Sequence, residues 1–508
     1  MSWPWLPAFL PLSRTACARL ARCGLGVLLM GLPCAAATLR GQLPGASQAV
    51  PPPEQPSLKP VSALIRLLLD TAATGGTRAA DARRGLHAGP EVRALYGAGC
   101  APAWTQPADS LNADATGALA LLARAPEFGL PADYLTPGLR ALRDSLRPRG
   151  SARLFAERPS QLARLDVALS DAVLRFMRDL GRGRLRPYTP SAREKAAGPA
   201  GQSAAVLRAA LGTPAVPAAM LAGQPISREY RQLQQVLARW LVRPIGSDSA
   251  VHQRQFEQAA VNLERWRWEA APDSAYVLIN LPAGELQVVS RELVRHRQRV
   301  VVGKPDTPTP TLNSAISYFT LAPEWHVPNS IATQEMLPRL RKDVDYLDRN
   351  NLVVYDAQGQ ERNPYHIRWA EVTAQHFPYS IRQTSCRKNV LGRIVFRFAN
   401  AYAVYLHDTP ERELFAQSNR AISHGCVRLE QPWQLARYLM SREPHPVLLP
   451  GDADWVCPRR PRNVRLQHPL PLRICYATCV AESGRLRFFP DIYHCDEALR
   501  QELFGLVP

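Results

Sequence analysis

Residues 405–428 constrain this chain more than any other stretch, because they hold a histidine and a cysteine at a fixed spacing. His407 follows an apolar run, and Cys426 comes nineteen residues later in the turn Ser-His-Gly-Cys. The run at 396–406 predicts a buried strand, whose apolar or aromatic members are Phe396, Phe398, Tyr402, Val404 and Leu406. Residues 430–440 predict the start of a helix. The expected order is therefore strand, histidine, irregular loop, cysteine and helix.

This pattern is typical of a cysteine nucleophile. A free thiol is mostly protonated at neutral pH, so a nucleophilic cysteine needs a nearby imidazole that holds it as a thiolate. His407 is the predicted general base, and it can pair with Cys426 as imidazolium. Gly425, just before the cysteine, lets a substrate approach the backbone closely. An isolated cysteine would indicate a buried structural thiol, but the histidine and the turn together favour catalysis.

The second ring nitrogen of His407 needs an acceptor that orients the ring. Backbone carbonyls of the neighbouring loop are candidates for this acceptor. Asp408 is adjacent in sequence, but successive side chains of a strand point to opposite faces. This alternation argues against Asp408 as the acid of a triad, and it leaves the acceptor open.

The same stretch resembles the signature of the L,D-transpeptidases, which are cell-wall enzymes with a cysteine nucleophile. Their motif is a histidine, a loop, and then Ser or Thr followed by His-Gly-Cys-x and Arg or Asn. The positions that match it here are His407, Ser423, His424, Gly425, Cys426 and Arg428. No cofactor is expected, because the sequence offers no metal constellation, phosphate loop or nucleotide motif.

The site residues follow from this resemblance and from the chemistry of acyl transfer. The backbone N–H groups of Gly425 and Cys426 are candidates for an oxyanion hole, and the family adds Tyr405. Arg428 is expected either to bind a substrate carboxylate or to brace the loop through an ion pair. The remaining candidates shape the turn, contact substrate or line the donor site, and they are Ser423, His424 and Trp325. A core tryptophan is the alternative for Trp325.

The implied reaction is acyl transfer through a thioester. Cys426 attacks the carbonyl after the third residue of a peptidoglycan stem tetrapeptide and releases D-alanine. The amine of a diamino acid in a second stem then accepts the acyl group, which gives a 3→3 cross-link. Carbapenem-type inhibitors are expected to acylate the same sulfur.

Two other classes of function stay open. With water as acceptor, the same thioester would make the protein an L,D-carboxypeptidase, an endopeptidase or a hydrolase that detaches proteins from the wall. A non-enzymatic wall-binding scaffold is the third hypothesis, although the intact pair of His407 and Cys426 argues against it. The net charge of +19 is compatible with a polyanionic partner or with biased composition, and no nucleic-acid motif is present.

The chain is expected to be α+β, with a mostly helical scaffold domain and a β-sandwich-like catalytic domain that carries a lid. The expected divisions are a signal peptide (1–37), a linker (38–57), the scaffold (58–243), a connector (244–270), the catalytic domain (271–450, lid about 325–388) and a C-terminal Cys-rich extension (451–508) that packs on the catalytic or scaffold region. Helical spacing of apolar residues predicts helices at 61–69, 162–180 and 233–242.

The scaffold half also resembles the large Gram-negative L,D-transpeptidases. The matching phrases include Leu95-Tyr96, Pro102-Ala103-Trp104 and the stretch from Phe128 to Tyr134. The helical Asp166 is expected to cap a helix or face solvent. The small peptidoglycan-binding module of the family has no counterpart between scaffold and catalytic domain, and Trp266 and Trp268 are expected to pack between domains.

The N-terminus predicts export to the periplasm. Basic residues precede an apolar run and a small-residue cleavage site after Ala37, while an uncleaved membrane anchor is the minority alternative and at most a peripheral membrane association is expected. Cleavage would leave seven of the ten cysteines. One or two disulfides are expected in an oxidising compartment among Cys457, Cys475, Cys479 and Cys495, with the pairing open.

Overall fold

The computed structural model describes residues 59–70, 85–106, 110–146, 152–185, 202–243, 249–270, 273–385, 388–449 and 460–505. The chain divides into two compact units, Met1–Ser57 and Leu58–Pro508, and the second unit is described here. The predicted signal peptide and linker, and also Cys386 and Cys457, lie outside the described residues. A search of the described helices finds none that is long and apolar enough to cross a membrane.

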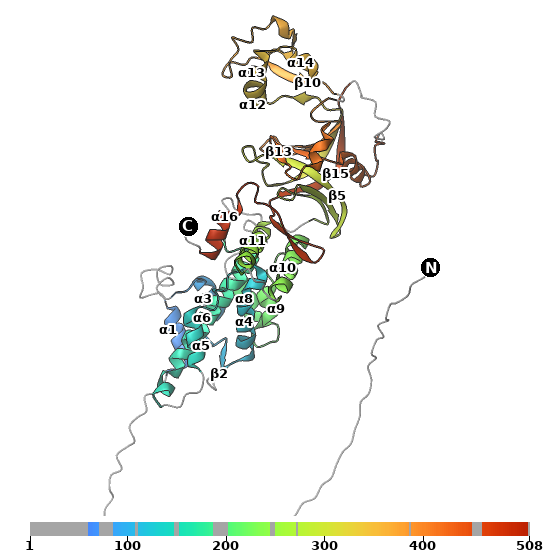
Figure 1. Ribbon diagram of the computed structural model, residues 1–508. Helices are drawn as coiled ribbons and strands as arrows, with labels where there is room; N and C mark the ends of the chain where they lie inside the picture. Colours follow the sequence, from blue (N-terminus) through green and yellow to red (C-terminus); the bar gives the residue numbers. More distant parts are fainter. Residues whose placement is uncertain are drawn as a thin grey trace, which may run out of the picture. The chain divides into compact units, whose positions relative to one another are not determined.

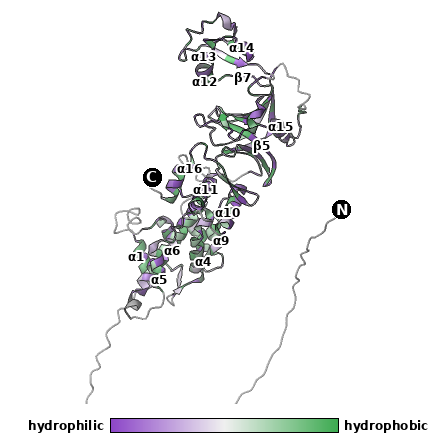
Figure 2. Cartoon of the chain, viewed as in Figure 1, coloured by the Kyte–Doolittle hydropathy of each residue, from purple (hydrophilic) through white to green (hydrophobic). Residues whose placement is uncertain are grey.

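The first part of this unit is mostly helical, as predicted (Figure 1). Its helices are α1 (Val61–Leu69), α3 (Gly89–Tyr96), α4 (Ala113–Ala123), α5 (Pro137–Ser145), α6 (Ala152–Arg182), α8 (Gln202–Ala210), α9 (Val216–Leu221), α10 (Arg228–Leu241) and α11 (Ser249–Trp268), with a 3₁₀ turn η1 (Ala125–Phe128) and the short strands β1 (Thr105–Gln106) and β2 (Ser110–Leu111). Figure 2 shows apolar and polar residues mixed along these helices, as in amphipathic elements. The apolar faces of α1, α3, α4, α5, α6, α8 and α9 form one core centred on α6, whereas those of α10 and α11 belong to a second cluster.

Asp166 is buried in this core, so its expected surface position is wrong. Its carboxylate lies on α6 and accepts hydrogen bonds from the Tyr96 hydroxyl, the Trp104 amide and the Thr105 hydroxyl. A buried carboxylate is stable only when such donors satisfy its oxygens. Asp166 therefore fastens the segment that follows α3 to the central helix.

The predicted connector is largely a packed helix. Within the described residues, 249–268 form α11, and Trp266 is buried with Tyr276, Leu278 and Val289 of the following domain. Packing between domains is thus the role of Trp266. At the same end of α11, the fully buried Arg267 pairs with Glu264 at 3.0 Å and donates to the carbonyls of Leu180 and Phe128.

A nine-stranded mixed sheet forms the centre of the second part. Its order is β13-β5-β14-β12-β11-β6-β15-β3-β4, and β4 also pairs with β5. The strands are β3 (Ala275–Asn280), β4 (Glu285–Ser290), β5 (Leu293–Gly303), β6 (Leu312–Leu321), β11 (Ile394–Phe398), β12 (Leu406–His407), β13 (Ala421–Ser423), β14 (Val427–Leu429) and β15 (Arg462–Cys475). The α+β class is confirmed, and the sandwich-like packing arises from one sheet that closes on itself through β5.

The sheet encloses an apolar core that α15 (Pro432–Met440) completes with Trp433, Leu435 and Leu439. This helix is the one that the sequence predicts after the cysteine. Because β12, β14 and α15 are all anchored in this core, the loop between His407 and Cys426 begins and ends on fixed structure.

Residues 462–475 are part of this sheet, which corrects the view of 451–508 as an extension packed on the domain. β15 pairs with β6 on one side and with β3 on the other. The rest of the C-terminal segment is a hairpin of β16 (Cys479–Glu482) and β17 (Arg485–Phe488), followed by α16 (Asp496–Phe504). The expected disulfides are wrong for the described cysteines, since Cys475, Cys479 and Cys495 are free thiols.

The predicted lid has its own small core. Its four strands, in the order β7-β10-β8-β9, are β7 (Trp325–His326), β8 (Leu352–Tyr355), β9 (Glu361–Arg362) and β10 (Ser380–Gln383). Short helical segments accompany them, namely α12 (Asn329–Ile331), η2 (Ala332–Met336), α13 (Leu337–Leu340), α14 (Tyr346–Arg349) and η3 (Pro364–His366). Figure 1 shows α12, α13, α14 and β10 grouped together, and their buried side chains form a cluster around Trp325, Met336 and Trp369.

The single strand predicted at 396–406 is instead two strands joined by a turn. β11 ends at Phe398, and Tyr402 is 62% exposed rather than buried. The cause is Asn400, whose side-chain oxygen accepts from the Tyr402 and Val404 amides while its amide group donates to the carbonyls of Phe398 and Val404. Asparagine favours such turns because its side chain substitutes for backbone partners.

The buried ion pair on α11 makes a prediction about stability. Replacing Arg267 by alanine should lower the free energy of unfolding by roughly 3–5 kcal/mol, because Glu264 would keep a buried charge without its counter-charge. Chemical denaturation measures this change. The control is Arg124→Ala, whose ion pair with Glu127 is 60% exposed on the arginine side and should contribute less than about 1 kcal/mol. Equal losses in the two variants would contradict the assigned role.

Candidate active site

The register of two short strands brings the predicted catalytic residues together. β12 and β14 are parallel, with Leu406 opposite Val427 and His407 opposite Arg428. Leu406 and Val427 are fully buried in the sheet core. Because side chains alternate along a strand, their neighbours point to the opposite face, and this face carries Tyr405, His407, Cys426 and Arg428.

This face borders a cavity of about 720 Å³ between the sheet and the lid. The sequence-predicted site residues that line it are Trp325, Tyr405, His407, Ser423, His424, Cys426 and Arg428. The lid contributes further side chains, among them Glu335, Met336, Arg339 and Gln383. These side chains thus meet in one cavity, although they come from β7, β12, β13, β14 and the residues just before β12 and β14.

The turn before the nucleophile is closed by Ser423. Its hydroxyl donates to the Cys426 carbonyl at 2.6 Å and accepts from the Gly425 N–H at 3.1 Å. Gly425 has φ of +112°, which side chains rarely tolerate. The glycine is therefore required for its backbone conformation, whereas the space beside it would accommodate a Cβ, whose first contact would lie at 3.7 Å.

The structure corrects the prediction that the Gly425 N–H is a donor of the oxyanion hole. Since its N–H already donates to Ser423, it is not available to a developing oxyanion in this conformation. Within the described residues, the Cys426 N–H donates no hydrogen bond to the protein. Tyr405 lines the same cavity as Cys426, so the Cys426 amide and the Tyr405 hydroxyl are the candidates that remain.

His407 is held in one tautomer by the backbone. Its Nδ1 lies 2.5 Å from the carbonyl oxygen of Asp408, and a carbonyl only accepts, so Nδ1 carries the proton. Nε2 is then free to take a proton as a general base. The acceptor that the sequence left open is this loop carbonyl, and the Asp408 carboxylate instead bonds Arg412 and the Arg393 amide.

The protonation states of the pair differ from the sequence expectation of a thiolate and an imidazolium. Burial, with a smaller contribution from the Arg428 charge, lowers the pKa of His407 to about 3. Burial also raises the pKa of the Cys426 thiol, against the hydrogen bonds from Tyr405. Both shifts favour neutral groups at neutral pH, because desolvation penalises the charged form. The site therefore favours a neutral thiol beside a neutral imidazole.

Tyr405 and Trp325 form the wall of the cavity next to the sulfur. The Tyr405 ring lies 5.8 Å from the His407 ring, and Arg397 covers its other side at 4.7 Å. Burial raises the pKa of Tyr405, so its hydroxyl remains protonated and can donate. Trp325 is 9% exposed in the lid core, so it is both a core tryptophan and a lining residue.

Arg428 forms the ion pair that braces the loop, which is one of its two predicted roles. Its Nη1 donates to the carboxylate of Glu411, which lies in the loop between His407 and Cys426. The arginine side chain is 21% exposed and borders the cavity. The ion pair thus ties this loop to β14 beside the site.

His424 connects the nucleophile turn to the lid. Its Nε2 lies 2.8 Å from Glu335 Oε1, and both side chains are 44% exposed. Glu335 belongs to the π-helical turn η2, and sequence reasoning missed it because no local motif marks it. Glu335 and His424 therefore form a solvated link between the lid and the turn. Among the described residues, no group of three or more His, Cys, Asp and Glu side chains is arranged to hold a metal ion.

The raised thiol pKa predicts how the reactivity of Cys426 depends on pH. The rate of alkylation of Cys426 by iodoacetamide, followed by mass analysis of its peptide, should rise with pH and have its midpoint above 9.0, the ordinary thiol value. His407→Ala should leave this midpoint nearly unchanged, since the imidazole is neutral. Thiolate–imidazolium pairs titrate at roughly 3.5–7.5, and a midpoint in that range would contradict the neutral pair.

Two family models and a curated relative match parts of this chain. Residues 274–449 match the model of the L,D-transpeptidase catalytic domain, YkuD, and residues 90–237 match the Scaffold domain. A Haemophilus influenzae protein named "Putative L,D-transpeptidase" is 30% identical over 279 residues, which are 53% of each chain. This chain thus spans about half the length of that curated relative.

Two solved structures are also similar in part. They are "L,D-transpeptidase from Mycobacterium smegmatis" and Mycobacterium tuberculosis L,D-transpeptidase 1, each 14% identical, with TM-scores of 0.18 and 0.16. The matches cover 41% of this chain and 61% and 64% of those chains. From the family models and the site geometry, this chain carries the YkuD catalytic domain of the L,D-transpeptidases together with a scaffold domain.

Proposed function

We propose that the protein is a peptidoglycan L,D-transpeptidase that forms 3→3 cross-links through a thioester on Cys426. The observation that carries the proposal is the single face of β12 and β14, on which Tyr405, His407, Cys426 and Arg428 meet at a cavity. A thiol, a base of fixed tautomer and a hydroxyl donor are the parts that acyl transfer requires.

In the first half-reaction, the Cys426 sulfur attacks the carbonyl carbon between the third and fourth residues of a stem tetrapeptide. The thiol proton passes to Nε2 of His407, and a sulfur–carbon bond forms. The Cys426 N–H and the Tyr405 hydroxyl stabilise the oxyanion of the tetrahedral intermediate. His407 then returns the proton to the leaving nitrogen, the carbon–nitrogen bond breaks, and D-alanine departs.

In the second half-reaction, the side-chain amine of a diamino acid in another stem attacks the thioester. Its carbon–nitrogen bond forms as the sulfur–carbon bond breaks, and the amine proton returns to the sulfur through His407. Water would compete as acceptor and give hydrolysis instead. The lid beside the cavity supports the transferase proposal, because closing elements protect acyl intermediates from water.

We propose the periplasm as the site of action, because the proposed substrate lies outside the cytoplasm. The export signal predicted at 1–37 is in keeping with this location. Arg428 is proposed to help hold the donor while its ion pair with Glu411 keeps the loop in place. Carbapenems are proposed as inhibitors, since their strained lactam carbonyl presents the same electrophile to Cys426.

The nucleophile is tested with purified chain and a disaccharide-tetrapeptide. The wild type should release D-alanine and form dimers. In Cys426→Ala the rates of both reactions should fall by a factor of roughly 10⁴ or more, because the nucleophile and its base act as one unit. The matched control is Cys100→Ser, whose side chain can keep the hydrogen bond to the Gly97 carbonyl. D-Alanine release by Cys426→Ala at the wild-type rate would contradict the mechanism.

The contribution of the lid is tested at Glu335. Glu335→Ala should raise the ratio of tripeptide to dimer by up to roughly fivefold, the equivalent of the ~1 kcal/mol that an exposed ion pair contributes. Mass spectrometry of the products measures the ratio. Glu371→Ala is the control, because Glu371 pairs with Arg368 elsewhere in the lid. If both variants keep the wild-type ratio, the link between His424 and Glu335 does not exclude water.

A further inference from the structure

We infer that Thr309 and Tyr493 are positioning residues, which hold the nucleophile turn through a brace anchored on helix α11 of the scaffold side. The inference rests on the proposed acyl transfer and concerns residues that do not touch the reacting atoms. Tyr493 lies beyond the stretch that matches the catalytic-domain model, which ends at residue 449.

Thr309 contacts the turn directly. Its hydroxyl donates to the Gly425 carbonyl at 2.8 Å and accepts from the Gly303 N–H at 2.9 Å, and its side chain is 2% exposed. The peptide unit that contains the Gly425 carbonyl also contains the Cys426 N–H. Because the peptide unit is planar, a bond that fixes this carbonyl also fixes the direction of the N–H that the mechanism uses for the oxyanion.

Tyr493 holds Thr309 in turn. Its hydroxyl donates to the Gly303 carbonyl at 2.6 Å and accepts from the Thr309 N–H at 3.2 Å. The loop between Gly303 and Thr309 is so close that a Cβ on Gly303 would lie 2.2 Å from the Thr307 carbonyl oxygen. Tyr493 therefore clamps both ends of a tight loop that lies against the turn.

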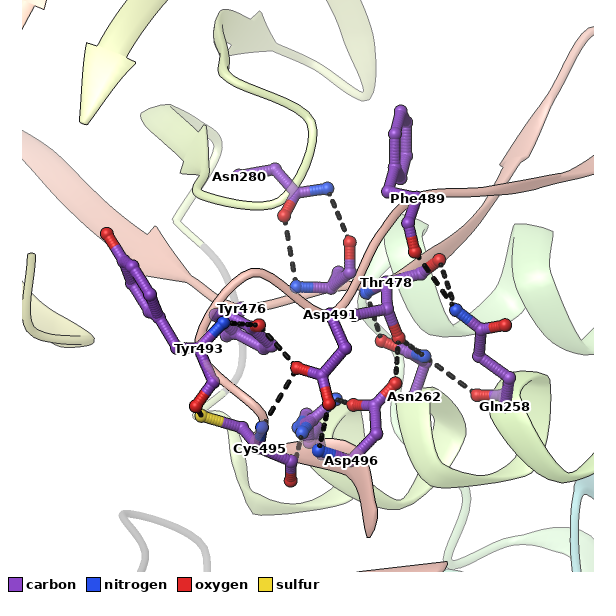
Figure 3. A network of polar contacts seen from close by, with 12 residues as sticks. Gln258, Asn262, Asn280, Tyr476, Thr478, Phe489, Asp491, Tyr493, Cys495 and Asp496 are labelled. Atoms are coloured by element: carbon purple, nitrogen blue, oxygen red, sulfur yellow. Dashed lines mark hydrogen bonds and ion pairs between the residues drawn. The ribbon is translucent and has the colours of Figure 1, made fainter. Parts of the chain in front are cut away.

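The clamp is itself anchored by a partly buried polar network, shown in Figure 3. The Tyr493 amide donates to the Tyr476 hydroxyl, whose own proton goes to Asp491. The second carboxylate oxygen of Asp491 accepts from the Asp496 amide at 2.9 Å. The rings of Tyr476 and Tyr493 are stacked at 5.6 Å, so the side chain of Tyr493 has little freedom.

The same network reaches α11. The Asp496 carboxylate accepts from the Thr478 hydroxyl at 2.6 Å, and the side chain of Asn262 exchanges two hydrogen bonds with Thr478 (Figure 3). Asn262 is fully buried on α11. Continuous hydrogen bonds thus run from α11 through the C-terminal segment to the carbonyl of Gly425. Networks that are fully satisfied make the parts they join rigid.

The test variant is Tyr493→Phe, which removes the hydroxyl and keeps the stacked ring. The value of kcat for D-alanine release from the tetrapeptide should fall by on the order of ten- to a hundredfold, the cost of a misplaced oxyanion donor. KM should stay within about twofold, because the cavity wall is unchanged. Alkylation of Cys426 by iodoacetamide should keep its wild-type rate, since that reaction forms no oxyanion. Thr309→Val should behave in the same way, and Thr309→Ser should restore the wild-type kcat.

The matched control is Tyr276→Phe, which removes a hydroxyl that donates to Glu229 away from the site and should leave kcat unchanged. A wild-type kcat in Tyr493→Phe would overturn the inference. So would a variant in which kcat, the alkylation rate and the melting temperature all fall, since that result indicates a general loss of structure.

Acylation by a carbapenem is measured in parallel, because it passes through the same oxyanion. A wild type that is inactive on the tetrapeptide would contradict the proposed function, whereas a wild-type rate of carbapenem acylation in Tyr493→Phe would contradict the brace.

Discussion

The parallel pairing of β12 with β14 is the constraint on which the rest of the site depends. Two ladder positions, Leu406 opposite Val427 and His407 opposite Arg428, decide which side chains face the core and which face the cavity. A slip of one residue would bury the nucleophile and expose the apolar pair, because the side-chain period of a strand is two. Burial of Leu406 and Val427 therefore sets the position of the chemistry.

The same burial determines which protonation states His407 and Cys426 favour. A dry environment lowers the pKa of His407 and raises that of Cys426, so the fold favours a neutral base beside a neutral thiol. The Asp408 carbonyl then fixes the tautomer and leaves Nε2 as the proton acceptor. The backbone thus supplies the orientation that a carboxylate supplies in other triads.

Much of the site could be predicted from the sequence, because the residues of the turn and His407 lie close together along the chain and their motif is specific. The spacing of apolar residues likewise predicted the scaffold helix at 61–69 and parts of α6 and α10. The ionisation states could not be predicted, since the desolvation of His407 is produced by tertiary packing. The expected buried strand at 396–406 was wrong because a single residue, Asn400, closes a turn within it.

Other features are set by contacts between distant parts of the chain. β15 comes after the matched catalytic stretch, yet it lies between β6 and β3, and its apolar pattern alone does not reveal its partners. Glu335 contacts the turn at His424, and Tyr493 holds the Gly303–Thr309 loop beside the turn. Both come from positions far from the turn in sequence, and neither carries a local signal. The direct test of the whole account is peptide mapping of the full chain after incubation with a stem tetrapeptide. The account predicts the mass of one tripeptide acyl group on the peptide that contains Cys426, and an acyl group on another cysteine, or none while D-alanine is released, would contradict it.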